Sequence, residues 1–139
     1  MTSSDSPADA MPVDPVLVVD DNAVNQLVTC EFLRTLGYDV ETADDGRSAL
    51  DMIAKHCFSV VLMDVQMPGM DGIEATRELR RREAQSGGRR NVVIALTANA
   101  FESDRERALA AGMDDFITKP VRLDLLARTL ARSIRGDAA

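Results

Sequence analysis

Short apolar segments alternate along this chain with segments of helical periodicity, and this alternation constrains the fold more than any other feature. We predict five strands, at residues 16–19, 39–42, 58–64, 91–97 and 114–118. The first, third and fourth are apolar throughout, as strands buried on both faces of a parallel sheet are. Repeated strand–helix units predict an α/β fold in which a parallel sheet carries helices on both faces, with right-handed crossovers.

Apolar residues recur at helical spacing between these strands. The clearest stripe ends before Gly37, a residue that favours the C-terminus of a helix. Its members are Val24, Leu27, Val28, Phe32 and Leu36. Similar stripes lie at residues 49–54 and 123–134, and residues 72–84 and 100–111 fit two helices with a less distinct apolar face.

Composition and charge narrow the class of protein. A chain of 139 residues with 45% hydrophobic content fits one domain. The formal net charge of −7 argues against nucleic acid or an anionic membrane as the main partner, because phosphates would be repelled. We see neither a membrane span nor a secretory signal, and therefore expect a cytoplasmic protein without membrane contact.

The two ends of the chain differ from its middle. Residues 1–14 are rich in Ser, Ala, Asp and Pro, which predicts a disordered tail or a linker. We place one domain at residues 15–135 and a frayed tail at 136–139. Cys30 and Cys57 lie in apolar surroundings, where free cysteine behaves as a small hydrophobe, and we expect no disulfide.

The segment 74–90 carries six arginines against three acids. We interpret it as a solvated helix face with ion pairs at i, i+4 rather than as a nucleic-acid site. The stretch AQSGGRR, at residues 84–90, reads as a flexible connection.

Polar side chains follow four of the predicted strands. They are Asp20 and Asp21 after the first strand, Asp64 after the third, Thr97 after the fourth and Lys119 after the fifth. In open α/β sheets the functional site lies outside the carboxyl ends of the strands, so we expect these side chains at one edge. Taken singly, each has an ordinary alternative: the aspartates and the threonine could cap helices or open turns, and the lysine could be solvated.

Together, these groups suit phosphoryl transfer. Three neighbouring carboxylates raise one another's pKa unless a cation compensates. Few oxygen ligands with room for water and phosphate favour Mg²⁺ over a Ca²⁺ cage. Metal, ammonium and hydroxyl groups would then meet the negative charge of a phosphoryl group, and Asp64 would be the nucleophile that forms an acyl phosphate.

Four segments resemble the receiver domains of response regulators in two-component signalling: VLVVDDNAVN, VVLMDVQMPGMDG, ALTANA and AGMDDFITKP. They are most similar to receivers attached to hybrid sensor histidine kinases, and the match spans residues 16–134. The resemblance implies a doubly wound, flavodoxin-like (βα)5 fold with a five-stranded parallel sheet. It also implies a signalling domain rather than an enzyme with outside substrates. Such a domain takes a phosphoryl group from a histidine kinase or a histidine phosphotransfer domain, hydrolyses it slowly, and is a monomer or weak dimer, alone or within a hybrid kinase.

The resemblance implies a role for each matching residue around the acceptor. Asp64 would be the phosphoacceptor, Asp21 a direct ligand of Mg²⁺, and Asp20 a ligand mainly through water or a support of the site. The backbone carbonyl of Gln66 would complete the protein ligands. We read Asp71 as a turn or N-cap residue outside the metal site.

The remaining matches concern the phosphoryl group and the switch. Thr97 and Lys119 would each contact a phosphoryl oxygen, and the Lys119–Pro120 peptide bond would be cis. Phe116, where the family often has Tyr, would respond to movement of Thr97 and switch the surface of the fourth helix, fifth strand and fifth helix. Without a hydroxyl this coupling is expected to be weaker or steric, and a core aromatic that never moves stays open as the alternative.

Two other functions remain to be compared. One is an Mg²⁺-dependent phosphohydrolase with an aspartyl nucleophile and outside substrates. The best-known family of that kind has a second Asp two residues after the nucleophile, where this chain has Gln66, and carries a cap domain for substrate. The other is a docking module that has lost phosphorylation, but here the acidic set is complete.

Overall fold

The computed structural model describes residues 14–67, 69–98 and 102–134. Its strands are β2 (Val16–Val19), β3 (Val40–Ala43), β4 (Val60–Asp64), β5 (Val93–Thr97) and β6 (Asp115–Thr118). Its helices are α1 (Ala23–Thr35), α2 (Gly46–Lys55), α3 (Gly72–Ser86), α4 (Glu102–Ala110) and α5 (Leu123–Ile134). The strands form one parallel sheet in the order β3-β2-β4-β5-β6, which confirms the predicted fold class.

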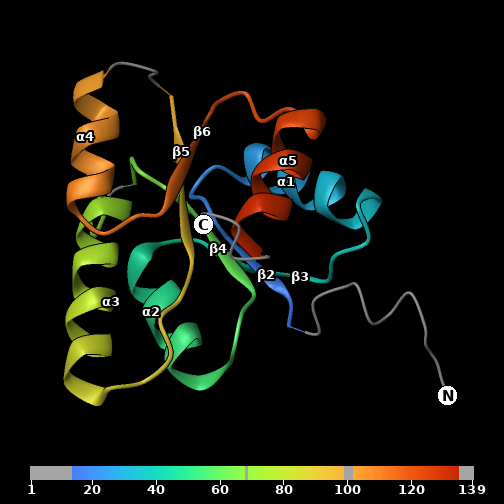
Figure 1. Ribbon diagram of the computed structural model, residues 1–139. Helices are drawn as coiled ribbons and strands as arrows, with labels where there is room; N and C mark the ends of the chain where they lie inside the picture. Colours follow the sequence, from blue (N-terminus) through green and yellow to red (C-terminus); the bar gives the residue numbers. More distant parts are fainter. Residues whose placement is uncertain (1–13, 68, 99–101, 135–139) are drawn as a thin grey trace, which may run out of the picture.

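The helices cover the sheet on both faces, with α1 and α5 on one side and α2, α3 and α4 on the other (Figure 1). Successive strand residues alternate between these faces. Val16 and Val18 pack with the first core, which contains Leu33 of α1 and Leu126 of α5. Leu17 belongs to the second core, beneath α2 and α3. A strand with apolar residues on both faces is therefore buried completely, as β2 and β4 are.

Strand order reverses direction between β2 and β4, which are neighbours although β3 separates them in the sequence. In doubly wound sheets this reversal opens a crevice at the carboxyl ends of the two strands. The fold thus places the residues after β2 and after β4 at the crevice.

The exposed face of α1 differs from the sequence expectation. Val24, Leu27 and Val28 are 67%, 60% and 42% exposed, and the buried residues of this helix are Thr29, Cys30 and Leu33. The three exposed residues lie in the first two turns, beside the carboxyl edge of the sheet, whereas Cys30 and Leu33 lie over the sheet core. The apolar surface of α1 is therefore wider than the part that the sheet covers.

An arginine-centred network joins the amino ends of β5 and β6. The Arg80 guanidinium donates to the carbonyl oxygens of Gly112 at 2.9 Å and Asn91 at 2.8 Å, and pairs with Glu83 at 2.8 Å and Asp114 at 3.1 Å. These partners come from α3 and from the segments that lead into β5 and β6. We call this set the Arg80 network.

Two expectations about loops are wrong. The segment before β5 is anchored rather than loose, because Arg89 donates to the carbonyl of Phe58 at 2.9 Å and Arg90 pairs with Asp114.

The apolar surroundings expected for both cysteines hold for Cys30, which is buried. Cys57 is exposed in the loop after α2, and both cysteines are free thiols. The i, i+4 pairs expected on α3 do occur, between Glu78 and Arg82. No helix within the described ranges has both the length and the apolar character needed to cross a bilayer.

Candidate functional site

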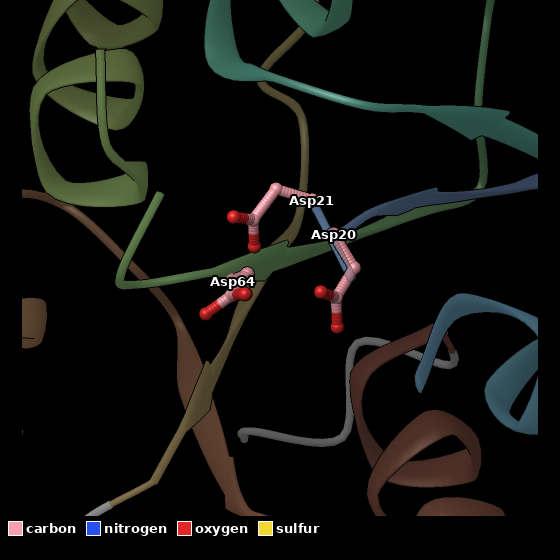
Figure 2. A group of neighbouring side chains, drawn as sticks. All are labelled: Asp20, Asp21 and Asp64. Atoms are coloured by element: carbon pink, nitrogen blue, oxygen red, sulfur yellow. The ribbon is translucent and has the colours of Figure 1, made fainter. Parts of the chain in front are cut away.

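Three carboxylates meet at the carboxyl edge of the sheet (Figure 2). Oxygen atoms of Asp20, Asp21 and Asp64 all lie within 4.8 Å of one another. Asp20 and Asp64 are only 1% and 4% exposed, whereas Asp21 faces solvent. The cluster is therefore a partly buried set of oxygen ligands with one open side.

Strand register explains this meeting. In the parallel pair β2–β4, Val19 lies opposite Met63, so the next residue of each strand, Asp20 and Asp64, stands at the same level. The four residues before Asp64 are fully buried. A carboxylate at the end of such a strand is held rigidly at the mouth of the crevice.

The aspartates after β2 do not cap α1, so that alternative is wrong. Asn22 is the N-cap, and its side chain accepts the N–H of Asn25 at 3.0 Å. Asp20 instead accepts the N–H of Asn22 at 2.9 Å. The Asp-Asp-Asn order carried this signal, because Asn is as good an N-cap as Asp.

Gln26 is a supporting residue that the sequence did not indicate. Its Nε2 donates to the backbone carbonyls of Asp20 at 3.1 Å and Ala43 at 3.2 Å. It thereby ties α1 to the loops that follow β2 and β3. Nothing in the local pattern distinguishes this glutamine, because its partners are distant in the sequence.

Lys119 contributes the positive charge among these side chains. Its Nζ lies 3.0 Å from Oδ2 of Asp64 and 3.3 Å from Oδ2 of Asp20. The Lys119–Pro120 peptide bond is cis, and the Lys119 N–H donates to the carbonyl of Thr97 at 2.7 Å. The loop after β6 is thus fastened to the end of β5 with its lysine in the crevice.

The charges at the site are not balanced. Burial raises the pKa of Asp64 to about 6, although the N–H of Gln66 and the ammonium of Lys119 both act to lower it, and Asp20 adds repulsion. Burial alone would lower the pKa of Lys119, yet the hydrogen bond and charge of Asp64, together with Asp20, raise it. The lysine therefore stays protonated, and one ammonium faces three carboxylates.

The loop after Asp64 passes very close to it. A Cβ on Gly72 would lie 2.2 Å from the carbonyl oxygen of Asp64, so only glycine fits there. Asp71 is the N-cap of α3 and forms a capping box with Glu74, which confirms its predicted role outside the acidic cluster. Gly69, with φ of +76°, makes the turn.

A cavity of about 350 Å³ opens beside the acidic cluster. Asp20 and Lys119 are its charged lining residues, and Val28, Ala98 and Pro120 are among its apolar walls. It therefore connects the charged groups with the exposed apolar face of α1. A group that enters this cavity from α1 reaches Lys119 and the carboxylate of Asp20.

Thr97 and Phe116 lie on the neighbouring strands. Thr97 ends β5 and is 7% exposed. Phe116 lies on β6 opposite Ala95 and packs against the core beneath α3 and α4. Gln66 is exposed two residues beyond Asp64, where its backbone faces the site through the N–H that donates to Asp64 at 3.0 Å.

The chemistry of the donor set fits a small hard cation. The carboxylates of Asp20, Asp21 and Asp64 leave an uncompensated negative charge and a solvent-facing side. Mg²⁺ prefers a few carboxylate oxygens together with several waters. The same arrangement does not offer the many protein oxygens of a Ca²⁺ cage.

Comparison with known proteins agrees with this geometry. The family model for the response regulator receiver domain matches residues 16–131. The sensor histidine kinase RcsC of Salmonella typhimurium is 39% identical over 131 residues, 94% of this chain but only 13% of RcsC. The chain thus spans a small part of the curated relatives that it matches.

Solved structures are similar over nearly the whole domain. The receiver domain of sensor histidine kinase PA1611 from Pseudomonas aeruginosa, with magnesium in its active-site cleft, is 44% identical with a TM-score of 0.78, covering 88% of this chain and 98% of that one. A co-crystal of the yeast phosphotransfer protein Ypd1 with the receiver domain of Ssk1 gives 31% identity and a TM-score of 0.83, covering 92% and 95%. On these matches, the chain belongs to the family of response regulator receiver domains.

Proposed function

We propose that this domain accepts a phosphoryl group on Asp64. The observation that carries the proposal is the position of this carboxylate, 4% exposed at the end of a buried strand, with Lys119 at 3.0 Å and two further aspartates beside it. Asp20, Asp21, Asp64 and the backbone carbonyl of Gln66 would hold Mg²⁺, which offsets negative charge on the transferring oxygens when it is bound.

In the proposed reaction an oxygen of Asp64 attacks the phosphorus of a phosphohistidine. The P–N bond breaks, its electron pair returns to the imidazole, and a P–O bond forms, giving an acyl phosphate. A pKa of about 6 leaves Asp64 mostly ionised at neutral pH, as a nucleophile must be. Lys119 and the hydroxyl of Thr97 would each bind one phosphoryl oxygen.

The same site supports slow loss of the phosphoryl group. Water attacks the phosphorus, and Asp64 leaves as a carboxylate while inorganic phosphate forms. Ala98 is exposed beside the crevice and small, so it leaves an approach for water. The hydrolase alternative, with outside substrates, has no support among the comparisons, which all point to receiver domains.

The partner would be a histidine kinase or a histidine phosphotransfer domain. Val24, Leu27 and Val28 form an exposed apolar face on α1, and Val28 also lines the cavity that holds Lys119. A histidine-bearing helix bundle that covers this face would bring its imidazole to the cavity. The Ypd1–Ssk1 receiver complex supports this class of partner.

We further propose that the domain is part of a hybrid kinase in the cytoplasm, where ATP supplies the phosphoryl group of the phosphohistidine. The surface formed by α4, β6 and α5 would transmit its signal.

The acceptor is tested by incubating the protein with acetyl phosphate and Mg²⁺ and measuring its intact mass. Wild type should gain one phosphoryl group, and Asp64→Asn should gain none. Asp71→Asn is the matched control, because this nearby acid only caps α3, and it should be labelled like wild type. An unlabelled wild type, or equal labelling of Asp64→Asn, would contradict the proposal.

The docking face is tested separately with a phosphorylated histidine phosphotransfer protein as donor. Leu27→Asp should slow transfer about tenfold or more by placing a charge in the apolar interface. Its labelling by acetyl phosphate should stay unchanged. Equal slowing with both donors would show damage to the site instead of loss of docking.

A further inference from the structure

A cation lies over the aromatic ring that the switch would use. The Arg105 guanidinium of α4 is 4.7 Å from the centroid of the Phe116 ring in β6. Cations within about 6 Å of an aromatic centroid are attracted by the negative face of the ring. This contact bridges a helix and a strand that both belong to the surface proposed to transmit the signal.

The Phe116 ring has two distinct sides. Ala95 of β5 is its register partner, and Thr97 lies two residues further along β5 and so on the same face. The Phe116 side chain thus packs against the core cluster that contains Ala95, and the Arg105 guanidinium lies over its ring. Phe116 lacks a hydroxyl, so packing and the guanidinium are what orient it.

The acid beside the ring does not compete for this arginine. Asp115 forms an ion pair with Arg132 of α5 and accepts the N–H of Phe116 at 2.8 Å. Arginines from α4 and α5 therefore flank β6, one over the ring and one on the neighbouring carboxylate.

We propose that Arg105 is a positioning residue, whose guanidinium holds the Phe116 ring in the orientation of the unphosphorylated protein and so opposes the switch. This inference rests on the proposed phosphorylation of Asp64 and on the expectation from the sequence that this phosphorylation shifts Phe116. A ligand shifts a two-state equilibrium only by its differential affinity, so a contact made in one state lowers the apparent affinity for a phosphoryl mimic. Loss of the contact should raise that affinity about two- to fivefold.

The test uses beryllofluoride with Mg²⁺ as the phosphoryl mimic and measures its affinity by titration. Arg105→Met keeps the length of the side chain and removes the charge, so it should bind the mimic about two- to fivefold more tightly than wild type. Arg105→Lys keeps a cation and should lie near wild type. Arg47→Met, an exposed arginine on α2, is the matched control and should change nothing.

A second measurement separates the cation contact from simple packing. Phenylalanine analogues with increasing fluorination, introduced only at position 116, weaken the negative ring face with little change in size. In the Arg105 protein, affinity for the mimic should rise stepwise with fluorination, and in Arg105→Met it should stay level. Equal responses in both backgrounds, or no response in either, would overturn the positioning role.

Failure of the proposed function has a different signature. If Asp64 is not the acceptor, wild type will not bind beryllofluoride, or Asp64→Asn will bind it equally well. If only the Arg105 inference is wrong, wild type will bind the mimic through Asp64 and the Arg105→Met affinity will equal that of wild type.

Discussion

Both ends of the sheet carry acidic and basic side chains, but these charges are balanced at one end and unbalanced at the other. At the amino ends of β5 and β6, Arg80 and Arg90 are matched by Glu83 and Asp114. At the carboxyl ends, Lys119 is the one cation that the described residues place against three aspartates. One end is neutralised internally, and the other retains negative charge for a bound cation to neutralise.

The pKa shifts reflect this contrast. Burial acts to raise the pKa of Glu83, but hydrogen bonds from Asn91 and Arg80 outweigh it and hold the pKa below its usual range. For Asp64, burial prevails over the hydrogen bonds from Gln66 and Lys119, and the pKa rises to about 6. The charges at the amino end therefore stabilise the fold, whereas the buried charge of Asp64 at the carboxyl end destabilises it.

The largest expected effect is at the amino end. Arg80→Met should lower the free energy of unfolding by about 2–4 kcal/mol, because it takes one ion-pair partner from each of the partly buried acids Glu83 and Asp114 and one donor from the carbonyls of Gly112 and Asn91. Urea denaturation measures this change. Arg81→Met is the control: its pair with Glu78 is exposed to solvent, so its loss should destabilise the protein much less than the loss of Arg80. Equal effects of the two substitutions would remove the distinction between network and surface pairs.

Neutralising a carboxylate should have opposite signs at the two ends. In metal-free protein at neutral pH, Asp64→Asn should raise the free energy of unfolding by about 1–3 kcal/mol, since it removes a buried charge that costs folding energy. Glu83→Gln should lower it by about 1–2 kcal/mol, since it weakens two hydrogen bonds to Asn91 and the pair with Arg80. Loss of stability in both variants would contradict the contrast.

The pH dependence of stability tests whether the charge of Asp64 destabilises the folded state. Asp64 has a pKa of about 6 when folded and an ordinary value of 3.8, so the folded state binds the proton more tightly. The stabilisation of the folded state that comes from protonation of Asp64 is fully present below pH 3.8 and is lost as the pH rises through about 6. Between pH 5 and 7, metal-free wild type should lose about 1 kcal/mol of stability that Asp64→Asn does not lose. The lowered pKa of Glu83 acts only in more acidic solution. A level profile for wild type would contradict the assignment.

The last of these predictions concerns the metal. Mg²⁺ at ten times its dissociation constant should stabilise wild type by about 1.4 kcal/mol. Asp64→Asn should gain less, because one of three ligands has lost its charge. Arg80→Met should gain as much as wild type, since its network lies at the other end of the sheet. Thermal unfolding with and without Mg²⁺ separates these cases. Equal stabilisation of wild type and Asp64→Asn would place the cation elsewhere.

Much of the fold could be predicted because it depends on local pattern. Val60 to Met63 are fully buried, as their unbroken apolar run predicted, and Asp64 ends the strand where that run ends. Parallel pairing then brought Asp20 and Asp64 together without further information. The acidic cluster could be predicted because the end of an apolar run in the sequence marks the end of a buried strand.

The remainder depends on contacts between distant segments. The Arg80 side chain donates hydrogen bonds to the carbonyls of Gly112 and Asn91, and no local periodicity in the sequence predicts either contact. Likewise, the apolar pattern of α1 does not tell which part the sheet covers, and Leu27 is exposed for that reason. Asn22 could have been recognised as the N-cap, but the adjacent acids offered the same chemistry.

The central claim is that the carboxylate at the end of β4 becomes an acyl phosphate. Borohydride reduces an acyl phosphate to an alcohol, so phosphorylated protein can be reduced, digested and sequenced by mass spectrometry. We expect homoserine at position 64 only, and only in samples that received both acetyl phosphate and Mg²⁺. Homoserine at Asp20, Asp21 or Asp71, with Asp64 unchanged, would contradict it.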